Sequence, residues 1–279
     1  MVTEPTLDNR CHQLWLRAAA SRATSASMTP APGNCRALKM KITVVSPTLN
    51  EAENVPCLIR EIGSVLAGLD YEIIVVDDDS PDRTWEVAQE FARQDSRIRV
   101  LRRQGSRSLG WSVIDGFTAA RGDVIVCIDA DLQHDPAILP HMLEQLSRGC
   151  DLVVGSRYAS GGGVGQWGRI RRFESWLATR LAQWLVHIQI HDPMSGYFLL
   201  RRTDFLAVRE SLNGQGFKIL LEMAVHLPNA RICEVPYTFR NRLAGQTKLS
   251  RRVVFAFISQ LWRLAHVKAM QVQTQSQTS

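Results

Sequence analysis

Short runs of β-branched and aliphatic residues alternate with helix-length segments from residue 41 onward. The runs are KITVVSP (41–47), YEIIVVD (71–77), RIRVL (97–101), DVIVCID (123–129) and DLVVG (151–155). Helices are predicted between them over residues 54–67, 83–94, 108–120 and 137–147. Strands that alternate with helices indicate an α/β fold, with a mostly parallel central sheet that is covered on both faces.

Polar residues follow four of these strands at the point where each one ends. The four loops are SPTLNE (46–51), DDDSPD (77–82), DADLQH (129–134) and GSRY (155–158). Ligands of such sheets bind beyond the carboxyl ends of the strands, so we expect the four loops to meet at one site. One such loop alone is typical of a turn or a helix cap, for which Ser80, Asp82 and Pro47 are ordinary residues. Four together favour a functional site.

Two carboxylates, Asp129 and Asp131, stand one residue apart at the end of the fourth predicted strand. They can face a common hard cation with Gln133 as a carbonyl ligand, and Mg²⁺ or Mn²⁺ accepts such oxygen ligands while it holds substrate phosphates. Two alternatives are open, because the same residues could cap a helix near Pro136 or form a general acid–base dyad. No glycine-rich loop of the GxxxxGK[ST] or GxGxxG type follows a strand, so nucleotide binding of those two kinds is not predicted.

The formal net charge of the chain is +6, and two stretches are rich in arginine. The arginines are Arg97, Arg99, Arg102, Arg103 and Arg107 in the first stretch, and Arg157, Arg169, Arg171, Arg172 and Arg180 in the second. Such stretches suit phosphates or an anionic membrane surface, but a solvated basic face is an equally good interpretation. No nucleic-acid-binding motif accompanies them, so nucleic acid is not predicted as a partner.

The six cysteines are scattered along the chain without CxxC spacing. Cys57, Cys127 and Cys233 lie in apolar helix or strand patterns, where a reduced cysteine acts as a small hydrophobic residue. We therefore expect a reducing, cytosolic setting. No run reaches the roughly 18 apolar residues that a membrane span requires, so no span is predicted.

The composition changes at the start of the first predicted strand. Residues 1–39 are rich in Ala, Ser, Thr and Arg, and this composition predicts a disordered extension. We expect one domain over residues 40–268 and a polar tail over residues 269–279.

Seven short motifs follow one another along the chain: PTLNE, DDDSPD, DADLQH, GSRY, DPMSGYF, FKILLE and FRNRLAGQTKL. Their order and spacing resemble those of the family 2 glycosyltransferases of GT-A fold, and most of all the dolichol-phosphate (polyprenyl-phosphate) mannose synthases. The resemblance covers residues 40–265. It implies the Rossmann-like, three-layer GT-A fold of nucleotide-diphospho-sugar transferases, with amphipathic C-terminal helices. It also implies a nucleotide-sugar donor, a divalent cation (Mg²⁺ or Mn²⁺) and a lipid-phosphate acceptor.

The resemblance further implies roles for individual residues. Those that match donor-binding positions are Pro47, Leu49, Glu51, Val76, Asp78, Asp129, Ala130, Asp131, Arg157, Arg171, Arg242 and Lys248. Those that match metal-binding positions are Asp129, Asp131 and Gln133, and those implied in catalysis are Asp129, Asp131, Arg157 and Arg242.

Two features depart from the family pattern. Leu49 stands where the family usually has Tyr, which removes an aromatic ring from the expected base or ribose pocket and leaves the choice between GDP- and UDP-sugars open. Many bacterial relatives continue into transmembrane helices, whereas this chain ends in MQVQTQSQTS. It is similar to the form in which the catalytic subunit has no span of its own.

The chemistry of the implied reaction is simple. A polyprenyl phosphate is already anionic, so it can attack the anomeric carbon without a general base, while cations stabilise the leaving diphosphate. We expect mannose transfer from GDP-mannose. The alternatives are a glucosyltransferase or another relative that uses a UDP-sugar, and a sugar-nucleotide or lipid-binding accessory subunit. Asp192 could act as a base for a hydroxyl acceptor, but its neighbours Pro193 and Gly196 favour a turn residue.

Two amphipathic helices are predicted over residues 176–188 and 250–268. The apolar stripe of the first comprises Trp176, Leu177, Leu181, Trp184, Leu185 and Ile188. Aromatic and basic residues together favour peripheral contact with the cytoplasmic face of a membrane, where a small membrane subunit is a further conceivable partner. The alternative is that both helices pack on the core.

Overall fold

The computed structural model describes residues 40–165, 167–215, 218–240 and 251–277. The predicted extension over residues 1–39 lies outside these ranges. Within them, seven strands form one sheet in the order β3-β2-β1-β4-β6-β5-β7. The strands are β1 (Ile42–Thr48), β2 (Tyr71–Asp77), β3 (Ile98–Arg102), β4 (Val124–Cys127), β5 (Leu152–Ser156), β6 (Phe198–Arg201) and β7 (Ile232–Pro236). The first five lie within two residues of the predicted runs.

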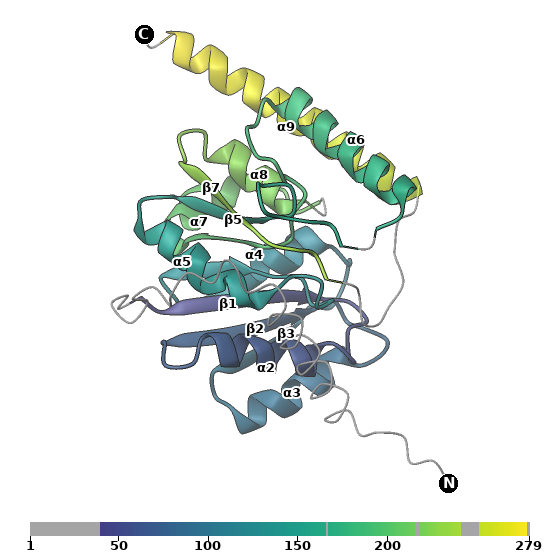
Figure 1. The fold of residues 1–279 in the computed structure, drawn as a ribbon, viewed down its shortest axis with the longest axis vertical. Coiled ribbons are helices and arrows are strands. Elements are labelled where there is room, and N and C mark those ends of the chain that lie inside the picture. Colours follow the sequence, from purple (N-terminus) through teal and green to yellow (C-terminus); the bar gives the residue numbers. More distant parts are fainter. Residues whose placement is uncertain (1–39, 166, 216–217, 241–250, 278–279) are drawn as a thin grey trace.

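Helices cover both faces of this sheet (Figure 1). They are α2 (Val55–Val65), α3 (Thr84–Gln94), α4 (Leu109–Ala119), α5 (Leu139–Ser147), α6 (Arg169–Val186), α7 (Arg202–Val208), α8 (Ile219–His226) and α9 (Arg251–Gln277), with short 3-10 helices η2 (Pro136–Ile138) and η3 (Arg209–Ser211). Helices α2, α3 and α5 share one apolar cluster with the sheet, and α4, α7 and α8 share the other. The predicted α/β layers are thus confirmed.

The strand register brings the predicted loops to one edge. Strands β1, β2 and β4 run parallel, with Pro47 opposite Val76 and Val45 opposite Cys127. Strand β5 runs parallel to β7, while β6 is antiparallel to both β4 and β5. The carboxyl ends of all the parallel strands therefore face the same side, and the segment that enters β6 starts from that side.

Close approach of α4 to the sheet depends on Gly116. A Cβ atom at this position would lie 2.4 Å from a methyl carbon of Val45 and 2.9 Å from one of Val76. Because such distances are well inside van der Waals contact, only glycine lets the helix pack this close over the strands that carry the site.

A third apolar cluster joins α6 and α9 to α8. Its buried residues include Ala182, Val186, Leu221, Phe257 and Leu261. The two long helices run side by side along one flank of the molecule (Figure 1). Helix α9 continues through residues 269–277, the region predicted as a polar tail. In the described part of the chain, no helix combines the length and the hydropathy needed to cross a membrane.

The apolar stripe predicted on the first amphipathic helix is divided between two environments. The exposed members are Trp176, Leu177 and Trp184, and the members packed against the third cluster are Leu181, Leu185 and Ile188. In α9, likewise, Phe257 is buried whereas Trp262 is 58% exposed. Packing on the core is therefore confirmed for one face of each helix, and the other face is open.

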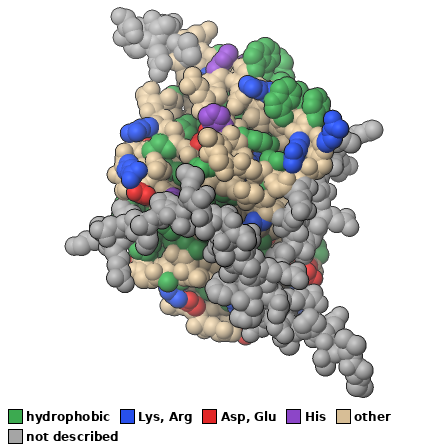
Figure 2. All heavy atoms as spheres, viewed as in Figure 1, with side chains coloured by type: hydrophobic (Ala, Val, Ile, Leu, Met, Phe, Trp, Pro, Cys, Tyr) green, Lys and Arg blue, Asp and Glu red, His purple; other side chains and the backbone are tan. Residues whose placement is uncertain are grey.

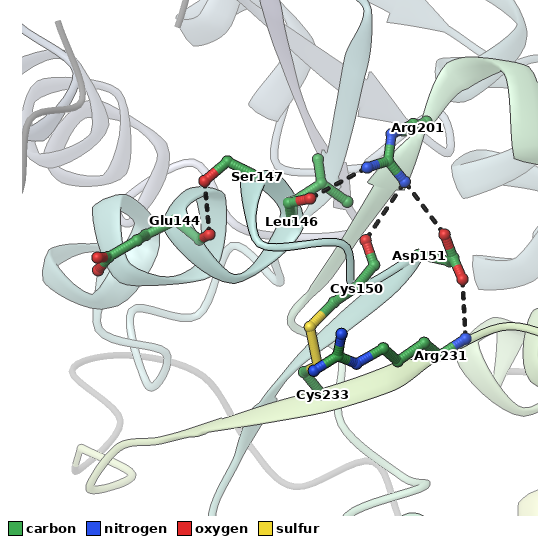
Figure 3. The surroundings of a disulfide bond; sticks show 8 residues. All are labelled: Glu144, Leu146, Ser147, Cys150, Asp151, Arg201, Arg231 and Cys233. Atoms are coloured by element: carbon green, nitrogen blue, oxygen red, sulfur yellow. Dashed lines mark hydrogen bonds and ion pairs between the residues drawn. A yellow bond between two sulfur atoms is a disulfide. The ribbon is translucent and has the colours of Figure 1, made fainter. Parts of the chain in front are cut away.

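A disulfide bond between Cys150 and Cys233 fastens the start of the edge strand β7 to the turn before β5 (Figure 3). Arg201 of β6 donates to the carbonyl oxygen of Cys150 and to the carboxylate of Asp151. The other oxygen of that carboxylate accepts the backbone N–H of Arg231 over 2.8 Å. Three strands are thus tied together at the end of the sheet opposite the predicted site.

The prediction of reduced cysteines is wrong for two of the three residues that supported it. Cys233 is bonded to Cys150, and Cys57 is also in a disulfide, whereas Cys127 is free and buried. The apolar pattern predicted burial but carries no information on which sulfurs meet, since the pair is 83 residues apart in sequence.

We expect the double substitution Cys150→Ala/Cys233→Ala to lower the free energy of unfolding by about 2–4 kcal/mol, because the bond closes a long loop in the unfolded chain. Urea denaturation in the absence of reductant measures this. An unchanged midpoint and slope would show that the bond does not form in solution.

Candidate functional site

The loops after β1 and β2 are hydrogen-bonded to one another at the carboxyl edge of the sheet. The backbone N–H of Asn50 donates to Ser80 Oγ over 2.9 Å, and that of Glu51 donates to Thr84 Oγ1 over 2.9 Å. Asp82 accepts the N–H of Thr84, the first residue of α3, over 3.0 Å. Ordinary turn and cap residues thus hold the two loops as one unit.

The predicted donor-binding residues of these loops lie along the same edge. Pro47 and Val76 are opposite each other in the β1–β2 register and are buried. Leu49 follows β1 and is half-buried. The carboxylate of Glu51 accepts a hydrogen bond from Asn54 Nδ2 over 2.6 Å at the start of α2.

Asp78 is fixed by two partners that the sequence did not identify. Its carboxylate is ion-paired with Arg103 and accepts the backbone N–H of Ser108 over 2.9 Å. Burial would lower the pKa of Arg103, but its bonds to Asp115 and Asp78 prevail and raise it. The arginine-rich stretch after β3 was the only sequence signal for this contact.

The loop after β4 is anchored to the segment that follows β7. Asp131 accepts the backbone N–H of Gln133 over 3.1 Å, and the Gln133 amide donates to the Arg240 carbonyl over 3.0 Å. Arg240 returns a backbone N–H to the Gln133 carbonyl over 2.9 Å. Its guanidinium is ion-paired with Glu61 and Asp135, at 2.8 and 2.6 Å.

Asp129 is half-buried and is the more accessible carboxylate of the pair, with 35% of its side chain exposed. Its Oδ2 lies 3.3 Å from His134 Nε2, and a Cβ atom on Gly196 would come within 2.1 Å of the same oxygen. Burial alone would raise the pKa of Asp129. The hydrogen bond and charge of His134 and the charges of Lys218 and Arg157 outweigh burial and lower this pKa, which keeps the carboxylate ionised.

Arg157, which follows β5, forms a two-point ion pair with Asp192. Its Nε and Nη2 each lie 2.7 Å from a carboxylate oxygen, and its backbone N–H donates to the same group over 3.0 Å. The rings of Tyr158, Trp167 and Phe239 surround the guanidinium, with centroids 5.1–5.4 Å from Cζ. Burial would lower the pKa of Arg157, but Asp192 raises it, so the cation is permanent.

Asp192 begins a turn, as predicted, since its carbonyl accepts the N–H of Ser195 over 3.2 Å. The sequence nevertheless missed its main role. Its side chain is fully buried and both oxygens are bound by Arg157, so it orients that cation.

Lys218 is a second cation of the site that the sequence did not assign. Its Nζ donates to the Met194 carbonyl over 3.0 Å, and it lies close enough to Asp129 for their charges to interact. Burial lowers the pKa of Lys218, Arg157 lowers it further, and Asp129 and Asp192 oppose the change. The FKILLE motif, which contains this lysine, was the available signal.

Three of the predicted cations are not placed. Arg242 and Lys248 lie outside the described residues, and Arg171 lies in α6 but its side chain is not described. Arg157 is thus the one predicted phosphate ligand whose surroundings the structure defines.

The residues after β4 fit a hard divalent cation. Asp129 and Asp131 offer carboxylate oxygens, Ala130 between them is buried, and the Gln133 amide nitrogen is bonded away from them, to Arg240. Among the described residues, no three His, Cys, Asp or Glu side chains gather as a metal cluster. Mg²⁺ and Mn²⁺ accept carboxylate and carbonyl oxygens of this kind, and Mg²⁺ in proteins usually keeps further positions for phosphate oxygens and water.

Comparison with known proteins identifies relatives over most of the chain. A profile of Glycosyl transferase family 2 matches residues 43–208. A dolichol-phosphate mannosyltransferase of Pyrococcus furiosus is 42% identical over 228 residues, which are 81% of this chain and 64% of that protein. This chain therefore spans less than two thirds of that relative. The enzyme of the same name from Saccharomyces cerevisiae is 35% identical over 81% of this chain and 88% of its own.

Solved structures with the same fold include glucosyl-3-phosphoglycerate synthase from Mycobacterium tuberculosis. A complex of that enzyme with Mn²⁺, UDP-glucose and phosphoglyceric acid has a TM-score of 0.62 at 22% identity, and covers 84% of this chain and 86% of its own. At this identity the likeness shows the GT-A fold alone. The predicted fold class is thereby confirmed.

Gly196→Ala should abolish sugar transfer while the protein stays folded, because the added methyl group would displace the Asp129 carboxylate. We expect a loss of at least about 100-fold, in line with misplacement of a reacting group by about 1 Å. Gly168→Ala is the matched control, since a Cβ there meets nothing within 4 Å. Circular dichroism and initial rates would measure both variants, and equal activities would refute this account of Gly196.

Proposed function

Because the chain belongs to glycosyl transferase family 2, we propose that it transfers mannose from GDP-mannose to the phosphate of dolichol or a related polyprenol. The observation that carries this proposal is the identity of 34–42%, over 80–81% of the chain, to three proteins named dolichol-phosphate mannosyltransferase. The site supports it, since carboxylates and cations lie at the carboxyl ends of the strands, where the resemblance to the family implies a donor site.

The reaction needs alignment and charge stabilisation rather than a proton acceptor. An oxygen of the acceptor phosphate attacks the anomeric carbon, a new carbon–oxygen bond forms, and the bond to the diphosphate breaks and releases GDP. Arg157 is held rigid by Asp192 and therefore offers its remaining N–H groups at no orientational cost. Lys218 supplies a second positive charge nearby. The acceptor carries its own negative charge, so Asp192 is not required as a base.

A divalent cation belongs to this proposal, with Asp129, Asp131 and Gln133 as its protein ligands. When bound, it would neutralise charge on the diphosphate leaving group. The structural neighbour bound with Mn²⁺ and UDP-glucose supports such a site, because it shares the fold. The same neighbour is one reason to keep a UDP-sugar as the alternative donor. The other is Leu49, which stands where an aromatic residue is expected near the base.

The open faces of α6 and α9 support contact with a membrane. Phe173, Trp176 and Trp184 are 60, 51 and 70% exposed, and the Arg180 guanidinium lies 5.9 Å from the Trp176 ring. Figure 2 shows hydrophobic and basic side chains together on this part of the surface. Each basic residue near an anionic surface contributes about 1 kcal/mol, and a buried aromatic ring adds a comparable amount, which is sufficient for reversible binding.

The proposed location is the cytoplasmic face of that membrane, where a small membrane subunit is a further candidate partner. The disulfide Cys150–Cys233 is the observation against this location, because such bonds are rare in reducing compartments. Alkylation of free thiols in intact cells before lysis distinguishes a reducing, cytoplasmic location from an oxidising one. Labelling of both cysteines supports the cytoplasmic face, and protection of both contradicts it.

Asp131→Asn should abolish transfer from GDP-mannose to polyprenyl phosphate, because it removes a charge that the cation needs and keeps an amide oxygen that can still accept the Gln133 N–H. Asp95→Asn is the control. Asp95 lies just before β3, at the amino ends of the parallel strands, so its substitution removes the same charge and should leave transfer unchanged. Rates with GDP-mannose and UDP-glucose, with Mn²⁺ or after chelation, test both metal and donor. Full activity of Asp131→Asn would refute the metal assignment, and no turnover of any donor would favour the accessory subunit.

Trp176→Ser/Trp184→Ser should weaken binding to anionic phospholipid vesicles by about 10-fold or more, because two aromatic rings no longer enter the lipid surface. Transfer to a long polyprenyl phosphate in vesicles should fall with it, while transfer to a short water-soluble prenyl phosphate should persist. Leu206→Ser is the matched control, since Leu206 is an apolar residue of α7 that is 43% exposed. Equal loss with both acceptors would contradict the membrane contact.

A further inference from the structure

His134 connects the end of β7 to the carboxylate at the end of β4. Its Nε2 lies 3.3 Å from Asp129 Oδ2, and its Nδ1 lies 2.6 Å from the Tyr237 hydroxyl. Both rings are almost completely buried, at 3 and 4% exposure. The sequence predicted His134 only as a polar loop residue, and the reaction described above makes no use of it.

The direction of the first hydrogen bond follows from the charge of its acceptor. An ionised carboxylate can only accept, so Nε2 of His134 must carry the proton and donate it to Asp129 in either charge state of the ring. With a neutral ring, Nδ1 then accepts from the Tyr237 hydroxyl. The hydroxyl thereby favours the tautomer in which Nε2 carries the proton that is donated to Asp129. Outer hydrogen-bond partners of metal ligands often fix tautomer and orientation in this way.

Three aromatic rings restrict the position of the His134 imidazole. The rings of Tyr197, Tyr237 and Phe239 pack around His134 with centroids 5.3–5.7 Å away. The backbone N–H of Tyr237 donates to the Ser156 carbonyl over 3.1 Å, which places the hydroxyl by the β5–β7 pairing rather than by a flexible loop.

Asp129 has few other restraints. Among the interactions resolved for the described residues, His134 supplies the one direct hydrogen bond to its carboxylate, while Gly196 limits its position only by contact. A carboxylate without this donor could rotate away from the position in which the structure holds it.

We propose that Tyr237 and His134 are positioning residues that hold the Asp129 carboxylate ready for a divalent cation, so that metal affinity depends on both side chains. This inference rests on the proposed function, because it takes Asp129 as a metal ligand. It assigns the aromatic cluster at the end of β7 a role in metal binding rather than in packing alone.

Binding of Mn²⁺ is the direct test, measured by electron paramagnetic resonance of the free ion, with and without GDP. His134→Leu should raise the dissociation constant about 10- to 100-fold, the usual cost of losing an outer partner of a metal ligand. Tyr237→Phe should raise it about 2- to 10-fold, the worth of one neutral hydrogen bond. His134→Gln should recover part of the affinity, because its amide can donate from the position of Nε2.

Tyr158→Phe is the matched control, since it removes a hydroxyl bonded to Ser175 over 2.8 Å and away from Asp129. Its Mn²⁺ affinity should equal that of the wild type. If His134→Leu fails to fold, Tyr237→Phe still decides, because it deletes a single oxygen atom.

The outcomes separate this inference from the proposed function. Loss of Mn²⁺ binding in Asp129→Asn together with wild-type affinity in His134→Leu or Tyr237→Phe would overturn the positioning role and leave the metal site intact. Equal weakening by Tyr158→Phe would also overturn it. Absence of Mn²⁺ binding by the wild-type protein, with and without GDP, would overturn the metal assignment and this inference with it.

Discussion

The buried ion pair between Arg157 and Asp192 is the interaction on which the geometry of the site depends. Asp192 is fully buried and Arg157 is 8% exposed, so neither charge has water to stabilise it. Removing either partner would leave an uncompensated buried charge, which costs about 3–5 kcal/mol. The pair joins residues 35 positions apart, and it holds the segment before β6 against the end of β5.

That segment reaches the site because β6 runs against its neighbours. A parallel strand delivers the residues that follow it to the carboxyl edge, whereas an antiparallel strand inserted between parallel ones delivers the residues that precede it. Strand β6 lies between β4 and β5, so Asp192 and Gly196 enter the site from the side where Phe198 begins the strand. Asp192 then fixes a cation, and Gly196 makes room for a carboxylate.

The sequence predicted what depends on neighbours along the chain. Strand periodicity located β1 to β5 within two residues, and the polar residues after them marked the edge where Asp129 and Asp131 lie. It did not predict β6, because four residues are too few to show a period. Without β6, the neighbours of Asp192 favoured a turn residue over a base, and its ion pair with Arg157 had no signal. It also left open whether the two amphipathic helices pack on the core, since a helical stripe does not show which of its residues, such as the buried Phe257, a neighbouring helix covers. Interactions between distant segments, such as the attraction between the charges of Lys218 and Asp129 and the disulfide between Cys150 and Cys233, leave no local pattern.

A buried glutamate links helix α9 to the reacting groups. Glu222 of α8 accepts hydrogen bonds from Gln260 and Arg263 of α9, at 3.2 and 3.0 Å, and Gln260 also donates to the Lys218 carbonyl over 3.2 Å. Because Glu222 is 1% exposed, its charge requires these donors, and α9 cannot leave α8 without a large cost in free energy. The apolar face of α9 that remains open therefore keeps a fixed position relative to Lys218. In the proposed function, this rigidity fixes the distance between Lys218 and the lipid surface. The acceptor phosphate at that surface would then encounter the Lys218 charge at the same position, whatever the length of the acceptor chain.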